Sequence, residues 1–152
     1  MSEYLSLDIL TPDGRVDLRV GDGNKPSGPA EAIEVEGVQL PAALGEMGVK
    51  PRHIPFLTPL VPCVVRFRYD GTDRRMAIGG GFLEISEDGV VTLLTDRAVR
   101  SWEVDVDATR GQLDAVLGEL KDHAHDAIDD AAVLKLKAQR DWLDAQLRAA
   151  QA

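Results

Sequence analysis

The sequence predicts a β + α fold, in which an antiparallel β-sandwich or barrel is followed by a two-helix antiparallel hairpin. Short stretches of alternating apolar and polar residues, joined by tight turns, recur along the first two thirds of the chain. Such spacing is typical of an all-β domain. Near residue 105 the period changes, and apolar residues recur every three to four positions, as on one face of a helix. This change predicts a β-sandwich domain at residues 1–104 and a helical hairpin domain at residues 105–152.

The composition predicts a soluble protein with a real core. Of the 152 residues, 44% are hydrophobic and 28% are charged, and the net charge is −9. So acidic a chain is not expected to bind nucleic acid, which needs clustered cations to offset the phosphates. We expect neither a membrane span nor a signal peptide, because no long apolar run and no basic N-terminal region is present. Cys63 is the only cysteine, and we expect it to be a small core residue.

The first part of the predicted sandwich has regular strand and turn signals. Residues 4–10 (YLSLDIL) alternate strictly and predict a half-buried strand. Residues 11–14 (TPDG) predict a turn, and the alternation in 16–20 predicts a second strand. Residues 21–29 have too little apolar surface to pack, so we expect a loop or flexible connection. Residues 32–40 predict a short pair of strands around a central Glu-Gly.

Two β-hairpins are predicted in the second part of the sandwich. Their strands are 64–69 with 74–78, and 82–86 with 90–95. Asp70-Gly71 is a strong two-residue turn signal, and residues 87–89 (EDG) form the second turn. Between the hairpins stand three glycines, Gly79–Gly81, which lack the following Lys-Ser/Thr of a phosphate loop. We expect them to permit a close approach of strands at a bend.

The segment Gly45–Cys63 (GEMGVKPRHIPFLTPLVPC) is unusual because it is both proline-rich and apolar. It holds four of the eight prolines. Since proline has no N–H to donate, this spacing is incompatible with one continuous central strand. The segment also carries polar residues, including Glu46 and His53, on what we expect to be a rigid, half-buried platform. Such a platform is typical of a contact surface.

Two helices are predicted at the C-terminal end. Asp107 is the expected N-cap of the first, and Asp129 and Asp130 are suited to the start of the second. The apolar stripe of the first helix is Leu113, Val116, Leu117 and Leu120, and that of the second is Ala132, Leu136, Leu143 and Leu147. Because both stripes are narrow, we expect the hairpin to be marginally stable alone and able to swing. Folded against the sandwich, it would bury the stripe of the first helix.

No residues have the spacing of an active site or a metal site. His53 has no adjacent Asp or Cys and no nucleophile motif. His123 and His125 stand two apart, and side chains at that spacing on a helix point away from each other. We expect a solvated polar turn there, and neither catalytic nor metal-ligating residues.

Several motifs together resemble the epsilon subunit of F-type ATP synthase, which is called delta in mitochondria. Residues 7–16 (LDILTPDGRV) are similar to the first strand and turn of this family. Residues 45–58 (GEMGVKPRHIPFLT) resemble its G-E-x-G-x-x-P-G-H-A-P-L-L-T signature, and residues 78–85 (IGGGFLEI) resemble its S-G-G-F-x-E signature. Residues 91–98 (VTLLTDRA) look like the strand that follows.

The resemblance implies a ten-stranded β-sandwich, a two-helix hairpin and a place in the central stalk of the synthase. It implies a non-catalytic rotor subunit that contacts subunit gamma and the c-ring, and a hairpin that extends along gamma, reaches the alpha and beta subunits and inhibits ATP hydrolysis. Glu46, Arg52 and His53 fall where family members contact the c-ring or gamma. Arg52 replaces the usual glycine, and Cys63 stands where glycine often follows proline, so a slightly different loop path is expected.

The start of the first helix partly matches an ATP-binding motif of the same family. The family pattern is I/L-D-x-x-R-A, and residues 106–111 (VDATRG) keep Asp107 and Arg110 but change both flanking positions. Capping by Asp107 with Arg110 on the surface explains these residues equally well. No obligatory cofactor is therefore expected, and ATP is a candidate regulatory ligand.

Two interpretations remain open at the sequence level. The first is the rotor subunit, peripheral on the cytoplasmic face of a bacterial inner membrane in a proton- or sodium-translocating synthase. The alternative is a free-standing β-sandwich that senses ATP through its helices. ATP binding without gamma, abolished by Asp107→Ala or Arg110→Ala, would distinguish the alternative.

Overall fold

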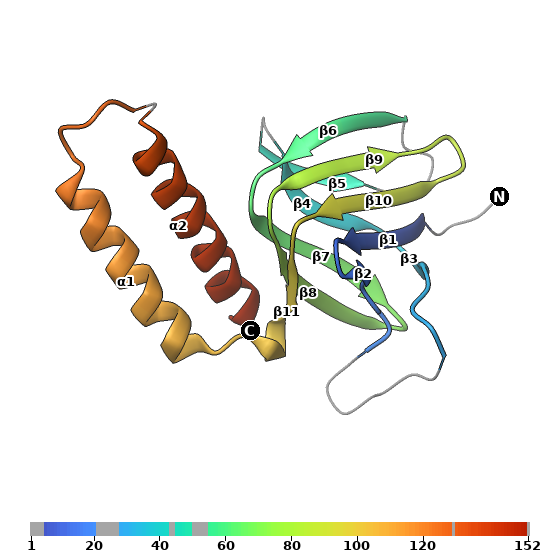
Figure 1. Cartoon of the computed structure of the whole chain (residues 1–152). Coiled ribbons are helices and arrows are strands. Elements are labelled where there is room, and N and C mark those ends of the chain that lie inside the picture. Colours follow the sequence, from blue (N-terminus) through green and yellow to red (C-terminus); the bar gives the residue numbers. More distant parts are fainter. Residues whose placement is uncertain (1–4, 21–27, 43–44, 50–54, 129, 152) are drawn as a thin grey trace.

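The computed structural model describes residues 5–20, 28–42, 45–49, 55–128 and 130–151. Within these ranges, strands form two sheets and two helices follow them (Figure 1). The first sheet contains β1 (Leu5–Thr11), β2 (Gly14–Arg15), β3 (Ile33–Val35), β6 (Phe56–Leu60), β9 (Gly81–Ile85) and β10 (Val90–Thr95). The second contains β4 (Val38–Ala42), β5 (Gly45–Val49), β7 (Cys63–Tyr69), β8 (Thr72–Ile78) and β11 (Ala98–Arg100). The predicted sandwich followed by helices is confirmed.

One strand pair departs from the predicted antiparallel arrangement. The first sheet runs in the order β2-β1-β10-β9-β6, with β3 also paired to β1. In it β1 and β10 are parallel, with Leu7 opposite Val91 and Ile9 opposite Leu93. The second sheet runs β11-β8-β7-β4-β5, and its pairs are antiparallel. β1 thus lies inside its sheet, next to β10, a strand that comes some eighty residues later in the sequence.

The core lies between the two sheets and is formed by the inward-facing residue of each alternating pair. Its most completely buried side chains are Leu5, Leu7, Ile9, Leu40, Ile78, Leu83, Leu93, Val35, Val38, Val65 and Val91. Cys63 belongs to this cluster and is 1% exposed, which confirms its expected role as a small core residue.

The proline-rich segment Gly45–Cys63 supplies an edge strand to each sheet. β5 ends the second sheet and β6 ends the first. Pro59 lies within β6, where only one side of the strand is paired, so its missing N–H leaves no gap in a ladder. The sequence argument against one central strand is therefore confirmed.

Both predicted hairpins are present, and the three glycines between them allow the expected close approach. Asp70 and Gly71 have positive φ values of 52° and 75° at the turn between β7 and β8, as a two-residue hairpin turn requires. A Cβ at Gly81 would overlap the carbonyl oxygen of Leu94 on β10, and one at Gly79 would overlap the carboxylate of Asp96. A side chain at position 81 would have to displace backbone, whereas at position 79 the exposed side chain of Asp96 would have to move.

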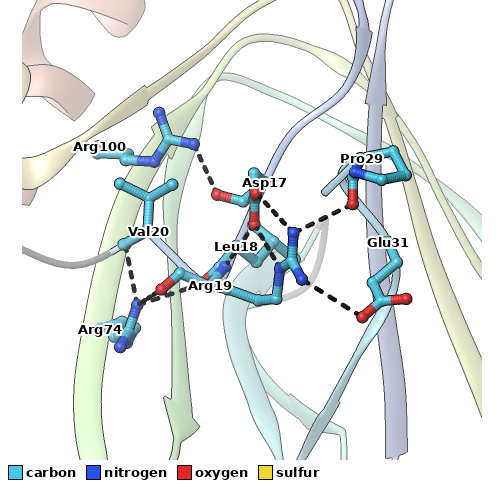
Figure 2. Close-up of polar contacts among 8 residues, drawn as sticks. All are labelled: Asp17, Leu18, Arg19, Val20, Pro29, Glu31, Arg74 and Arg100. Carbon is cyan, nitrogen blue, oxygen red and sulfur yellow. Dashed lines mark hydrogen bonds and ion pairs between the residues drawn. The ribbon is translucent and has the colours of Figure 1, made fainter. Parts of the chain in front are cut away.

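The second predicted strand, at residues 16–20, is wrong: β2 consists of Gly14 and Arg15 alone. The carboxylate of Asp17 accepts the backbone N–H of Arg19 at 3.0 Å, a local turn that competes with ladder pairing. The carbonyls of this segment are taken by side chains (Figure 2): Nη1 of Arg74 lies 2.9–3.2 Å from three of them, and Nη2 of Arg100 lies 2.6 Å from that of Asp17. The segment is anchored by guanidinium groups that stand far along the chain. Leu18 is still buried.

The strands predicted at residues 32–40 exist, but they do not pair with each other. β3 pairs with β1 and β4 pairs with β5 and β7, so Glu36 and Gly37 carry the chain from one sheet to the other. The alternation showed which residues face inward, but it could not show which strands were neighbours.

The helices are α1 (Val106–Asp122) and α2 (Ala131–Ala150), and a short 3-10 helix, η1 (Ser101–Glu103), precedes them. The predicted N-cap at Asp107 is wrong. Asp105 caps α1, its Oδ1 accepting the N–H of Ala108 at 3.1 Å, while Asp107 lies in the first turn. Asp130 caps α2 in the same way. Neither helix is long and apolar enough to cross a membrane. That residues 1–104 and 105–152 are separate domains stays a prediction.

The helix faces differ partly from the predicted stripes. Val116 of α1 packs with Leu136 and Leu143 of α2, and Leu113 and Leu120 join this cluster. Leu117 is 41% exposed and Ala132 is exposed, so these two residues do not belong to the buried stripes. The remaining predicted stripe residue, Leu147, is half-buried.

A second apolar face of α2, which the sequence patterns did not reveal, covers the outer face of β7 and β8 (Figure 1). It consists of Trp142, Ala145 and Ala149, which pack against Val64 and Ala77. Because α2 lies between α1 and the sheet, the stripe of α1 is buried against α2. In the folded hairpin this stripe is therefore covered, as expected, but by α2 and not by the sheet.

Candidate functional site

The outer face of the six-stranded sheet carries a row of exposed apolar side chains. Phe82 of β9 is in register with Pro59 of β6 on one side and with Leu94 of β10 on the other. Phe82 is 51% exposed and Leu94 is 44% exposed. Strand alternation places these side chains outward, because their neighbours Leu83 and Leu93 are fully buried.

The apolar row continues along β6. Leu57 lies two residues before Pro59 and is 66% exposed, and Val61 lies two residues after it and is 64% exposed. Adjacent strands lie about 4.8 Å apart, so these side chains gather on one surface, the apolar face, defined as Leu57, Pro59, Val61, Phe82 and Leu94. Contiguous exposed apolar surface of this kind marks an interaction site.

None of these five residues was a predicted contact residue, although Leu57, Pro59 and Val61 belong to the proline-rich segment that was expected to form a contact surface. Leu57 and Phe82 stood inside the two signatures that carried the family resemblance, but their exposure depends on the pairing of β6, β9 and β10. The available signal was that outward positions on two consecutive predicted strands, Phe82 and Leu94, are both large and apolar. A solvated sheet face would carry polar residues there.

The opposite, outer face of the five-stranded sheet is partly covered by the helical hairpin, which packs on it at Val64 and Ala77. The ring of Trp142 on α2 is stacked by the guanidinium of Arg97, whose Cζ lies 4.4 Å from the ring centroid. Arg97 follows β10, so this cation–π contact connects the sandwich to the hairpin. The two outer faces of the sandwich thus differ: the chain's own helix covers part of one, whereas the other carries the exposed apolar face.

The predicted contact residues belong to the first half of the proline-rich segment. Glu46 is in β5, with its backbone opposite Pro41 of β4. Its side chain, and the whole of Arg52 and His53, lie outside the described residues. Their roles as contacts with gamma or the c-ring stay predictions.

The candidate ATP residues Asp107 and Arg110 lie close together in the first turns of α1. Both are exposed, and no ion pair or hydrogen bond joins their side chains to another side chain in the part of the chain that the structure describes. Because Asp105 caps α1, the side chain of Asp107 is not needed as the N-cap.

The predicted polar turn between the helices contains one defined contact. Nδ1 of His123 and Oδ2 of Asp126 are 2.5 Å apart. This hydrogen bond to Asp126 raises the pKa of His123, and the surrounding carboxylates add to the effect. His125 is exposed. Among the described residues, no group of three or more His, Cys, Asp or Glu side chains could hold a metal ion.

Comparison with known families gives a match over half of the chain. Residues 25–101 match the family described as "ATP synthase, Delta/Epsilon chain, beta-sandwich domain". The ATP synthase epsilon chain of Anaeromyxobacter sp. (strain K) is 34% identical over 106 residues, which is 70% of this chain and 69% of that protein. That of Alkalihalophilus pseudofirmus is 30% identical over 125 residues, covering 82% and 83% of the two chains.

This chain belongs to the ATP synthase delta/epsilon family. Its membership confirms the resemblance that the signatures at residues 45–58 and 78–85 indicated. The apolar face is built from strands β6, β9 and β10, and these strands lie inside the matched range.

Solved structures show the same fold. A chain of the mitochondrial ATP synthase of Euglena gracilis, solved as an OSCP/F1/c-ring assembly, aligns with a TM-score of 0.75 and 20% identity, over 99% of this chain and 82% of that one. A chain of the Tetrahymena thermophila central stalk/c-ring assembly aligns with a TM-score of 0.56 and 9% identity, over 97% and 96%. The second alignment extends over almost the whole length of both chains, so helices as well as sheets are shared.

Proposed function

We propose that this chain is a non-catalytic rotor subunit in the central stalk of a proton- or sodium-translocating ATP synthase. The observation that carries the proposal is the exposed apolar face, found in a chain that belongs to the delta/epsilon family. The similar chains from Euglena and Tetrahymena come from F1/c-ring and central stalk/c-ring assemblies, which supports a position between F1 and the membrane ring. The subunit then acts on the cytoplasmic face of a bacterial inner membrane, peripheral to the bilayer.

The apolar face is the proposed docking surface for subunit gamma. Fully burying an exposed Leu or Phe side chain gains about 1.5–3 kcal/mol. Because Leu57, Val61, Phe82 and Leu94 are between 44% and 66% exposed, about half of that gain is still available at each. The four side chains together offer roughly 3–6 kcal/mol before the costs of association. A micromolar interface needs about 8 kcal/mol after association costs of about 4–15 kcal/mol, so this face would supply part of the binding energy and further contacts the rest.

The first half of the proline-rich segment is the proposed contact with the c-ring. Glu46, Arg52 and His53 supply polar groups there, and the edge position of β5 leaves one side of this strand free of sheet neighbours. Proline-rich backbone loses little entropy on binding, which favours a rigid polar contact.

The hairpin is the proposed regulator of ATP hydrolysis. Its attachment to the sandwich rests on Trp142, Ala145 and Ala149 of one helix, a small patch compared with the sandwich core. Release of this patch would free both helices together, because α1 packs on α2. The freed hairpin could then extend along gamma and reach the alpha and beta subunits.

A second candidate function, ATP sensing, is favoured by the position of Asp107 and Arg110. Both are exposed at the start of α1, and Asp105 performs the capping that would otherwise explain Asp107. A free-standing sensor would bind ATP without gamma. Calorimetry with ATP on the isolated chain tests this: loss of the heat signal in Asp107→Ala and in Arg110→Ala supports it, and no signal in the unmodified chain rejects it.

The rotor proposal is tested by capture of gamma from the same source. We expect the unmodified chain to bind gamma and Leu94→Arg to bind at least tenfold more weakly, because a charge would be buried in the apolar face. Leu134→Arg is the matched control, since Leu134 is 51% exposed on α2 and lies outside that face. Equal loss in both variants, or no binding by the unmodified chain, would refute the proposal.

A further inference from the structure

An open cleft of about 520 Å³ lies on the outer face of the five-stranded sheet. α2 covers this face at Val64 and Ala77, which are register partners on β7 and β8. Two residues further along the same strands, and on the same face, stand Arg66 and Arg75. Both line the cleft, together with Gln39 of β4, the register partner of Arg66. The volume is that of a small-ligand site.

The other two arginines of the cleft are already engaged. Arg68 pairs with Asp73 at 3.1 Å and lies 3.9 Å from Glu36. Arg74 points to the other side of the strand, where it donates to the carbonyls of residues 18–20. Both acidic side chains of the cleft, Glu36 and Asp73, are therefore paired with Arg68.

Arg66 and Arg75 have no acidic partner among the described residues. They are nevertheless directly opposite each other in an antiparallel pair, an arrangement in which like charges repel. This is unexpected in a chain with a net charge of −9, where acidic side chains are abundant. A bound anion would neutralise both guanidinium groups and remove the repulsion.

We propose that Arg66, Arg75 and Gln39 form a binding site for a phosphate group. Two guanidinium groups carry a charge of +2, and a phosphate monoester carries about −1.5 to −2 at pH 7, so the charges match. Guanidinium groups arriving from two neighbouring strands can donate to different oxygens of a tetrahedral anion, and the amide of Gln39 can add a further donor. Glu36 and Asp73 also line the cleft, and both are paired with Arg68.

The phosphate can be free or can be the terminal group of a nucleotide. This site lies on the sheet and is distinct from the candidate ATP residues Asp107 and Arg110 at the start of α1. The two sites can therefore be separated by substitution, and neither depends on gamma.

The test is thermal unfolding of the full chain in sodium phosphate, in ADP or in ATP, each against sodium chloride of equal ionic strength. We expect phosphate-bearing ligands to raise the unfolding temperature in a saturable manner, because a ligand that binds only the folded state stabilises it. Arg66→Gln and Arg75→Gln should each weaken the apparent affinity at least tenfold. Lys135→Gln, the matched control at an exposed cation of α2, should retain it. A response to free phosphate identifies the anion itself as ligand, whereas a response confined to ADP and ATP identifies the nucleotide.

Three results would overturn the proposal: no shift beyond that in chloride, an unchanged shift in both Arg66→Gln and Arg75→Gln, or an equal loss of the shift in Lys135→Gln. Folding of the variants is checked by their unfolding temperature in chloride. We expect it to stay equal or to rise, because each substitution removes one of two opposed positive charges.

Discussion

A glutamate at position 145 is expected to detach the helical hairpin from the sandwich while leaving the sandwich folded. Ala145 of α2 is 0% exposed and packs on the outer face of β7 and β8 in a cluster with Trp142 and Ala149. That cluster is separate from the core between the sheets. A charged side chain at position 145 therefore disturbs only the attachment of the hairpin.

The magnitudes favour detachment. Burying a Trp removes about 150–250 Å² from water, which at about 25 cal/mol per Å² stabilises the docked state by about 4–6 kcal/mol, and two Ala methyl groups add about 1–2 kcal/mol. Holding a helix in one position offsets several kcal/mol of this sum. Only a small net free energy of docking remains. The larger side chain of a glutamate at position 145 would overpack the contact with the sheet, which costs about 1–3 kcal/mol. Keeping the buried glutamate neutral at pH 7, from a usual pKa of about 4.3, costs roughly 3–4 kcal/mol more.

The fluorescence of Trp142 reports the detachment. The chain has two tryptophans, so Trp102→Phe leaves Trp142 as the single emitter. Trp142 is 7% exposed, and we expect its emission to shift to longer wavelength in Ala145→Glu. Ala138→Glu is the matched control, since Ala138 is exposed on the same helix. The reasoning is refuted if both variants emit alike, or if Ala145→Glu loses the cooperative unfolding of the sandwich.

Three further predictions concern the sandwich. Arg74→Met should lower the free energy of unfolding in urea by about 2–3 kcal/mol, because a charged donor to three backbone carbonyls is lost. Arg66→Met is the control. It loses no ion pair to a described residue, so it should change the free energy of unfolding by less than about 0.5 kcal/mol. Gly81→Ala should lower the free energy of unfolding by about 2 kcal/mol or more, since its Cβ would meet backbone on β10. Gly111→Ala on the open face of α1 should raise it by about 0.8–1 kcal/mol. Equal effects of the two substitutions would contradict this prediction. The hydrogen bond from the guanidinium of Arg19 lowers the pKa of Asp17 in the folded chain. The ionised carboxylate therefore stabilises the fold above the unfolded pKa of about 3.9, and this stabilisation is lost as the pH falls through the folded pKa. Asp17→Asn should flatten the dependence of the unfolding free energy on pH in this acid range, and an unchanged dependence would disprove the contribution.

The elements that depend on local signals were predicted well from the sequence. The turn at Asp70-Gly71 needs only its own two residues to adopt positive φ, and the helices need only their period. The strand predicted at residues 16–20 does not form, although the alternation correctly indicated that Leu18 is buried. Backbone carbonyls of this segment accept hydrogen bonds from Arg74 and Arg100, which stand more than fifty residues away in the sequence. No local pattern contains that information.

The candidate site was predicted less completely for a similar reason. The signatures at residues 45–58 and 78–85 indicated the family, but the apolar face exists only after β6, β9 and β10 are placed side by side. The docking face of α2 was missed because Ala145 and Ala149 also suit an exposed helix position. Their burial is decided by the flat surface at Val64 and Ala77 opposite them.

The parallel pairing of β1 with β10 also determines when the sandwich can form during synthesis. Leu7 leaves the ribosome long before its partner Val91, so one side of an apolar strand has no neighbour until both hairpins have been made. Such distant pairings make folding slow. The sheet is therefore expected to be completed late, when the β9–β10 hairpin pairs with β1 through the free edge of β10. A nascent chain that stops before residue 90 would present β1 and β9 as two open edges, which are surfaces that a chaperone would bind.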